Sequence, residues 1–164
     1  MKHEDSTDRV LVADDDQSIR QLLGTIIKRE RLEVDLAADG AEAIEYLEKG
    51  EYSVILLDLM MPRVDGFGVI EHLRNHPATH KPVVIVITAY ADQRFKEVDA
   101  EIVSGVLRKP FDVAEVGSLV RLCINGFKSA IGKEIRDADA TLRILTPEGV
   151  ERLREIRGED SEAN

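Results

Sequence analysis

Short apolar runs alternate along the chain with segments in which apolar residues recur every three or four positions. Five of these runs are typical of strands and cover residues 10–13, 34–38, 54–57, 83–87 and 105–107. The third and fourth runs are apolar throughout rather than alternating, which indicates strands covered on both faces, as in a parallel sheet. The pattern therefore predicts a sheet whose central strands are buried.

The segments between these runs predict helices. Apolar positions in residues 19–27 follow helical spacing after Asp16, whose residue type commonly caps a helix. Further helices are expected at residues 41–49, at residues 67–73 before Pro77, at residues 93–100 and at residues 113–123. Alternating strand–helix units predict a doubly wound α/β fold with a five-stranded parallel sheet.

Composition narrows the class of protein. The chain has 164 residues, 43% of them hydrophobic, which is enough for one domain with a buried core. Its formal net charge of −10 argues against nucleic-acid and membrane-surface partners, because both require clustered basic residues. The single Cys123 excludes an internal disulfide and suits a reducing cytoplasm. No segment approaches the roughly 18 apolar residues of a membrane-spanning helix, and the apolar run at residues 10–13 is too short for a signal-peptide core.

Polar residues follow the predicted strands at the points where the strands end. The residues concerned are Asp14, Asp15 and Asp16 after the first strand, Asp58 after the third, Thr88 after the fourth and Lys109 after the fifth. The carboxyl ends of parallel strands share one edge of the sheet, where such folds bind ligands. We therefore expect these side chains to meet in one crevice.

The chemistry follows from the charges. Clustered carboxylates repel each other unless a cation joins them, and Mg²⁺ prefers a few carboxylates together with water and phosphate oxygens. A carboxylate at such a site can act as a nucleophile and form an aspartyl phosphate, while a metal ion and a lysine offset charge on the transferring oxygens. A hydroxyl such as that of Thr88 can hydrogen-bond a phosphoryl oxygen and so respond to its presence.

Four motifs resemble those of bacterial two-component response-regulator receiver domains of the stand-alone chemotaxis type. They are residues 10–20, which open with Val-Leu-Val-Ala-Asp-Asp-Asp, residues 58–66 with the sequence Asp-Leu-Met-Met-Pro-Arg-Val-Asp-Gly, residues 87–89 with Ile-Thr-Ala, and residues 109–111 with Lys-Pro-Phe. The match spans residues 9–124. The resemblance implies a flavodoxin-like fold with strand order 2-1-3-4-5.

The resemblance also implies a phosphoacceptor and a metal site. Asp58 would take a phosphoryl group from a phosphohistidine donor, which is a sensor histidine kinase or a histidine phosphotransfer protein. Asp14 and Asp15 would hold Mg²⁺, Asp15 most directly, with Asp58 and the backbone carbonyl of Met60 completing the protein ligands. The protein would catalyse only its own phosphorylation and dephosphorylation and would signal to a downstream protein target.

Further roles implied by the resemblance concern the switch. Lys109 would pair with Asp58 and later with the phosphoryl group, and Thr88 would be the switch hydroxyl. Pro110 would follow a cis peptide bond, and Gly66 would supply backbone freedom to the loop. The aromatic residue that the family places on the fifth strand is replaced by Val106, which argues against a ring-flip switch.

One enzymatic alternative starts from the same acidic run. In a phosphohydrolase of the haloacid-dehalogenase type, Asp14 would be the nucleophile and Asp16 the general acid. Against this alternative, no acidic pair follows Lys109 at a fifth strand, no cap domain is evident and Asp58 has no role. His72 and His76 have a spacing that can bind zinc, but no further ligands support such a site.

The ends of the chain lie outside the resemblance. We expect residues 1–8 to be disordered, residues 9–124 to form the receiver domain and residues 125–164 to form a helical extension. Apolar residues at spacings of three and four predict that the last receiver helix continues to about Leu145. This stripe could fold back on its own domain, or it could pair with a second copy or dock on a partner. We favour the second possibility, which includes a homodimer formed through this extension.

Overall fold

The structure is a computed structural model of the chain and describes residues 8–77, 82–89, 99, 101–134 and 142–144. The described elements, in order, are β1 (Arg9–Ala13), α1 (Gln17–Arg29), β2 (Glu33–Ala37), α2 (Gly40–Lys49), β3 (Val54–Leu57), α3 (Gly66–Asn75), β4 (Val83–Thr88), β5 (Val103–Arg108), α5 (Val113–Glu134) and β6 (Leu142–Ile144). The expected helix at residues 93–100 lies outside the described residues, apart from Asp99, which is not helical.

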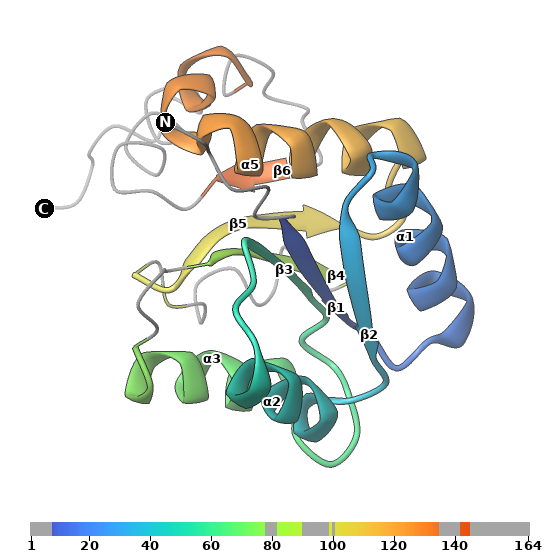
Figure 1. Cartoon of the computed structure of the whole chain (residues 1–164), viewed down its shortest axis with the longest axis vertical. Coiled ribbons are helices and arrows are strands. Elements are labelled where there is room, and N and C mark those ends of the chain that lie inside the picture. Colours follow the sequence, from blue (N-terminus) through green and yellow to red (C-terminus); the bar gives the residue numbers. More distant parts are fainter. Residues whose placement is uncertain (1–7, 78–81, 90–98, 100, 135–141, 145–164) are drawn as a thin grey trace, which may run out of the picture.

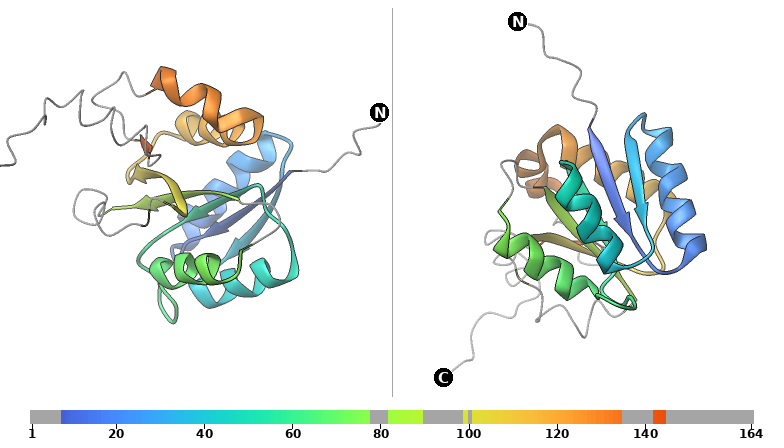
Figure 2. Two further views of the ribbon diagram at one scale, coloured as in Figure 1. Left: turned by 90° about the vertical axis from the view of Figure 1, so that its left-hand side faces the viewer. Right: turned by 60° about the horizontal axis from the view of Figure 1, so that its bottom comes forward.

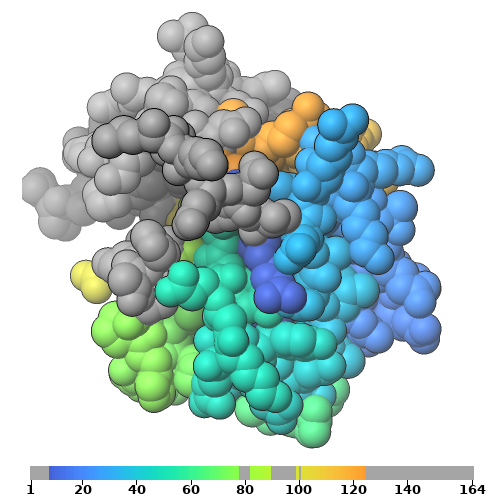
Figure 3. Space-filling view, viewed as in Figure 1, coloured from blue at the N-terminus to red at the C-terminus, as the bar shows by residue number. Residues whose placement is uncertain are grey.

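The strands form one twisted sheet in the order β2-β1-β3-β4-β5-β6. The first five are parallel, which confirms the predicted five-stranded arrangement of order 2-1-3-4-5. Helices α2 and α3 lie together on one side of the sheet, and α1 and α5 lie on the other (Figures 1 and 2). The space-filling view shows α2 and α3 side by side on the lower part of the molecule (Figure 3).

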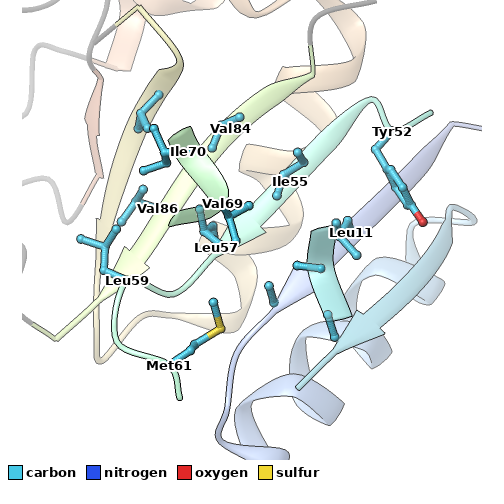
Figure 4. Close-up of a cluster of buried hydrophobic side chains, with 14 of the residues drawn as sticks. Leu11, Tyr52, Ile55, Leu57, Leu59, Met61, Val69, Ile70, Val84 and Val86 are labelled. Atoms are coloured by element: carbon cyan, nitrogen blue, oxygen red, sulfur yellow. The ribbon is translucent and has the colours of Figure 1, made fainter. Parts of the chain in front are cut away.

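Two layers of buried side chains fill the space between the sheet and its helices. Leu11, Ile55, Leu57 and Val86 belong to the layer that faces α2 and α3, together with Val69 of α3 (Figure 4). The alternate strand positions join α1 and α5 in the second layer. All four residues of β3 are buried, as expected for a strand that is covered on both faces.

The C-terminal segment departs from the predicted helical extension. Helix α5 continues to Glu134, but Leu142–Ile144 form strand β6 instead of the end of a helix that reaches Leu145. Strand β6 runs antiparallel to β5, with Ile144 opposite Gly105 and Leu142 opposite Leu107. Alternation of apolar and polar residues at 142–144 suits a strand, and an edge strand such as β5 offers backbone groups that another strand can pair with. Residues 135–141 and 145–164 of the predicted extension lie outside the described residues.

None of the described helices has the length and apolar character that crossing a membrane requires.

Candidate functional site

The backbone carries the predicted polar residues to one edge of the sheet. In register, Ala13 lies beside Leu57. The ladder continues past the strand ends, because the Asp58 amide donates to the Ala13 carbonyl at 2.9 Å and the Lys109 amide donates to the Thr88 carbonyl at 3.0 Å. The residues that follow β3 and β5 are therefore fixed by the same hydrogen bonds that build the sheet.

Four charged side chains meet at this edge. The Lys109 ammonium lies 2.7 Å from Asp14 Oδ2 and 3.2 Å from Asp58 Oδ2. Asp14 is 1% exposed and Asp58 is 6% exposed, whereas Asp15 is exposed to solvent. Carboxylate oxygens of Asp14, Asp15 and Asp58 all lie within 4.8 Å of one another. The structure thus brings together four residues that are 95 positions apart at their extremes.

The remaining oxygens of the two buried carboxylates accept hydrogen bonds from the backbone. Asp14 Oδ1 accepts from the Asp16 amide at 2.9 Å, and Asp58 Oδ1 accepts from the Met60 amide at 3.2 Å. These bonds fix the orientation of both carboxylates, because each side chain is held at one oxygen by the backbone and at the other by Lys109. The site is therefore pre-formed.

Asp16 has a different role from its two acidic neighbours. Its carboxylate accepts from the amides of Ser18 at 2.8 Å and Ile19 at 3.1 Å and so caps helix α1. This confirms the predicted cap. A carboxylate held by two backbone donors at a helix end is poorly placed to act as the general acid of a phosphohydrolase.

Burial and charge shift the proton affinities in the cluster. Burial raises the pKa of Asp58, the Lys109 charge opposes that rise, and the Asp14 charge adds to it. Burial lowers the pKa of Lys109, but its hydrogen bond to Asp14 and the charges of Asp58 and Asp14 outweigh burial, so the net shift is upward. Lys109 therefore stays protonated at neutral pH.

The donor set fits a hard divalent cation. Three carboxylates share the cluster with one ammonium group, so negative charge is in excess. Closely spaced carboxylate oxygens are the ligands that Mg²⁺ prefers, and a cation would relieve the repulsion between them. Among the described residues, this is the one group of three or more acidic, histidine or cysteine side chains close enough to hold a metal ion.

The other predicted residues lie around this cluster. Thr88 is buried at the carboxyl end of β4, and the Met60 side chain is largely exposed. Val106 is buried in the core layer that faces α2 and α3. The peptide bond between Lys109 and Pro110 is cis, as the resemblance implied.

Gly66 is required for a reason other than the backbone freedom we expected. Its φ lies outside the left-handed region, but a Cβ at this position would lie 2.4 Å from the backbone oxygen of Asp58. The Gly66 amide also donates to the Leu59 carbonyl at 2.9 Å. The start of α3 is thus pressed directly against the segment that carries Asp58, and only glycine leaves enough space.

Sequence reasoning missed two residues that brace the loop between β3 and α3. Asp39 caps α2 and binds the Arg63 guanidinium. Arg63 has a φ of 64°, a conformation that is uncommon outside glycine. The Asp-Gly pair at residues 39–40 was the available signal, but no local pattern links it to residue 63.

Comparison with known proteins assigns the chain to a family. The family model of the response regulator receiver domain matches residues 10–121, and the chain belongs to this family of signalling domains. The transcriptional regulatory protein SrrA of Staphylococcus aureus is 36% identical over 113 residues, which are 67% of this chain and 45% of SrrA. The chain spans less than half of the length of the curated relatives that it matches.

Solved structures agree with this assignment. The receiver domain of the Francisella response regulator 1452 is 30% identical, with a TM-score of 0.65, and the match covers 72% of this chain and 97% of that domain. The response regulator TrrA of Thermotoga maritima, solved in complex with Mg²⁺-BeF, is 28% identical, with a TM-score of 0.63 and coverage of 71% and 98%. The chain is thus a phosphoacceptor-type receiver of a two-component system.

Proposed function

We propose that Asp58 is the residue that accepts the phosphoryl group, from a sensor histidine kinase or a histidine phosphotransfer protein. The observation that carries this proposal is the Lys109 ammonium, which bridges buried Asp14 and Asp58 beside exposed Asp15. Asp58 follows the central strand β3, and burial raises its pKa, which makes its oxygen a better nucleophile than an ordinary carboxylate oxygen once it is ionised.

Asp14, Asp15 and Asp58, together with the Met60 backbone carbonyl, would hold Mg²⁺. When bound there, the ion supplies positive charge that offsets the charge of the transferring phosphoryl oxygens. In the transfer, an oxygen of Asp58 forms a bond to phosphorus as the phosphorus–nitrogen bond of the donor breaks. Lys109 stays protonated and balances the negative charge that passes from the carboxylate to the phosphoryl group.

The signal would leave the site through Thr88 and the fourth and fifth strands. The Thr88 hydroxyl would hydrogen-bond a phosphoryl oxygen and draw the end of β4 inward. Val106 has no ring to reorient and, as a β-branched residue, few rotamers, so the response would run through backbone movement and packing. A downstream protein target would then distinguish the two states.

Uptake from acetyl phosphate, followed by intact mass, tests the assignment of Asp58. We expect one phosphoryl group per chain with Mg²⁺, little uptake with a chelator, and none in Asp58→Asn. Asp65→Asn is the matched control, because Asp65 lies in the same loop, is exposed and caps α3, a role that asparagine can fill. Uptake that persists in Asp58→Asn would refute the proposal, and sustained hydrolysis of a small phosphate ester by that variant would favour the phosphohydrolase.

The homodimer through residues 125–164 and the cytoplasmic location remain predictions. Pairing of β6 with β5 of the same chain supports the alternative in which this segment folds back on its own domain. Sedimentation with and without a phosphoryl donor distinguishes the two. A mass of two chains would support the homodimer, and a mass of one chain at high concentration would refute it.

A further inference from the structure

The loop between β3 and α3 carries Asp58 and Met60, so its position decides where their oxygens lie. Both ends of the loop are fixed, since the Met60 amide donates a hydrogen bond to Asp58 Oδ1 and the Gly66 amide donates one to the Leu59 carbonyl. The outer part of the loop reaches a different element, helix α2. Contacts that fix the outer part of the loop therefore also help to fix the positions of Asp58 and Met60.

Three contacts join the outer part of the loop to the start of α2. The Gly40 amide donates to the Val64 carbonyl at 2.9 Å. A Cβ at Gly40 would lie 2.2 Å from the same carbonyl oxygen, so the two backbones touch. The Arg63 guanidinium donates from Nε to Asp39 Oδ2 at 2.7 Å and contacts the same oxygen through its terminal nitrogen.

Asp39 is well placed to anchor this contact. It is 7% exposed, and its second oxygen accepts from the Glu42 amide at 2.9 Å, which fixes the side chain on α2. Arg63, by contrast, has a 65% exposed side chain and a backbone in the left-handed region. An arginine that adopts this conformation with so little burial is held mainly by its partner, because such conformations persist only where the surroundings determine them.

We propose that Arg63 and Asp39 form a positioning pair that holds the loop in the conformation needed for metal binding and phosphoryl uptake at Asp58. The proposal rests on the proposed function for its activity readout. Exposed ion pairs contribute little to folding stability. If Arg63 had a purely structural role, its substitution would therefore change stability only slightly and would not affect the loop specifically. A positioning role predicts effects that are confined to the loop.

The chain offers a closely matched control. Arg74 on α3 donates from Nε to Asp99 Oδ2 at 2.9 Å and contacts the same oxygen through its terminal nitrogen, as Arg63 does with Asp39. The Arg74 side chain is also about half exposed. Its partner precedes β5 rather than α2, so Arg74→Ala removes an ion pair of the same kind without touching the loop.

The first readout needs neither metal nor donor. In the metal-free protein, Arg63→Ala should raise amide hydrogen exchange at Gly40 and Met60 about tenfold, the loss expected for a hydrogen bond to a charged group. Arg74→Ala should leave both amides unchanged. Equal exchange at these amides in wild type and Arg63→Ala would overturn the proposal, and so would an equal rise in Arg74→Ala.

The second readout is Mg²⁺ affinity by calorimetry, together with the rate of uptake from acetyl phosphate. Loss of groups that orient metal ligands typically weakens metal affinity by about 10-fold or more, and we expect about tenfold for Arg63→Ala. Arg63→Lys keeps the charge and an ammonium donor but not the planar guanidinium, so it should recover part of the lost Mg²⁺ affinity and uptake rate. The double variant Arg63→Ala with Asp39→Asn should lose no more than the larger single loss, because paired residues are not additive.

Failure of this inference is distinguishable from failure of the proposed function. If wild type takes up no phosphoryl group, the proposed function fails, while hydrogen exchange and Mg²⁺ affinity still decide whether Arg63 positions the loop. If wild type takes up the group and Arg63→Ala matches it in rate, exchange and affinity, the positioning role is refuted.

Discussion

Gly66→Ala tests the close contact between helix α3 and the backbone of Asp58. The added Cβ would lie 2.4 Å from the Asp58 oxygen and 2.6 Å from the Leu59 Cα, whereas real Cβ atoms essentially never come within 3.0 Å. Both neighbours are backbone atoms, so one of the two segments must move by at least 0.6 Å, the difference between 3.0 and 2.4 Å. Overpacking of this kind costs about 1–3 kcal/mol of unfolding free energy.

The same displacement should affect the chemistry more than the stability. A shift on the order of 1 Å near reacting groups can lower a rate about 100-fold, so we expect phosphoryl uptake to fall about 10- to 100-fold. Initial rates of uptake from acetyl phosphate measure this, with thermal unfolding measured in parallel to show that the variant is folded.

Gly24→Ala is the control for this experiment. Gly24 lies inside α1, where the nearest atoms to an added Cβ are side-chain carbons of Leu36 at 3.3 Å and beyond. The end of the Leu36 side chain must shift by a few tenths of an ångström, while alanine favours the helix interior over glycine, so we expect stability to change little and uptake not to fall. Uptake at the wild-type rate in folded Gly66→Ala would refute the reasoning that this glycine positions Asp58.

Three further changes have expected outcomes. Lys109→Met leaves two buried carboxylates without their cation and should lower the unfolding free energy by about 3 kcal/mol without metal, with Mg²⁺ restoring much of the loss in thermal melts. Asp16→Ala should cost about 1 kcal/mol in urea unfolding through loss of the α1 cap, yet phosphoryl uptake should persist, because the Asp16 carboxylate caps the helix. The Glu42 amide, followed by Arg63, holds the pKa of Asp39 below its usual value of 3.8. The contribution of the ionised Asp39 carboxylate to stability is therefore present above pH 3.8 and is lost as pH falls through the lower pKa of the folded state. Asp39→Asn should weaken the pH dependence of the urea unfolding midpoint over this range. An unchanged pH dependence would contradict the stabilising role assigned to the Asp39 carboxylate.

The core of the fold could be predicted because parallel strands leave a clear signal. Runs such as residues 54–57 are apolar at every position, and each is followed by a polar residue where the strand ends. Once the strands are parallel, topology alone brings Asp14, Asp58 and Lys109 to one edge. The meeting of distant residues was thus readable from local patterns.

The remaining features depend on contacts between segments that carry no local signature. Strand β6 pairs with β5 across more than thirty residues of sequence, and its three residues fit a helical stripe as well as a strand. Gly66 needs space because of where α3 meets β3, and the Arg63 conformation follows from Asp39 on another helix. Such requirements become visible only when the elements are placed in space.

Identifying the side chain that carries the phosphoryl group tests the central claim most directly, that one pocket formed by Asp14, Asp15, Asp58 and Lys109 directs phosphorylation. The protein is treated with acetyl phosphate and Mg²⁺, borohydride reduces the acyl phosphate to an alcohol with release of phosphate, and the peptides are sequenced by mass spectrometry. The account predicts that the reduced residue is Asp58. Reduction at Asp14 or Asp15, or reduction distributed over surface carboxylates, would contradict it.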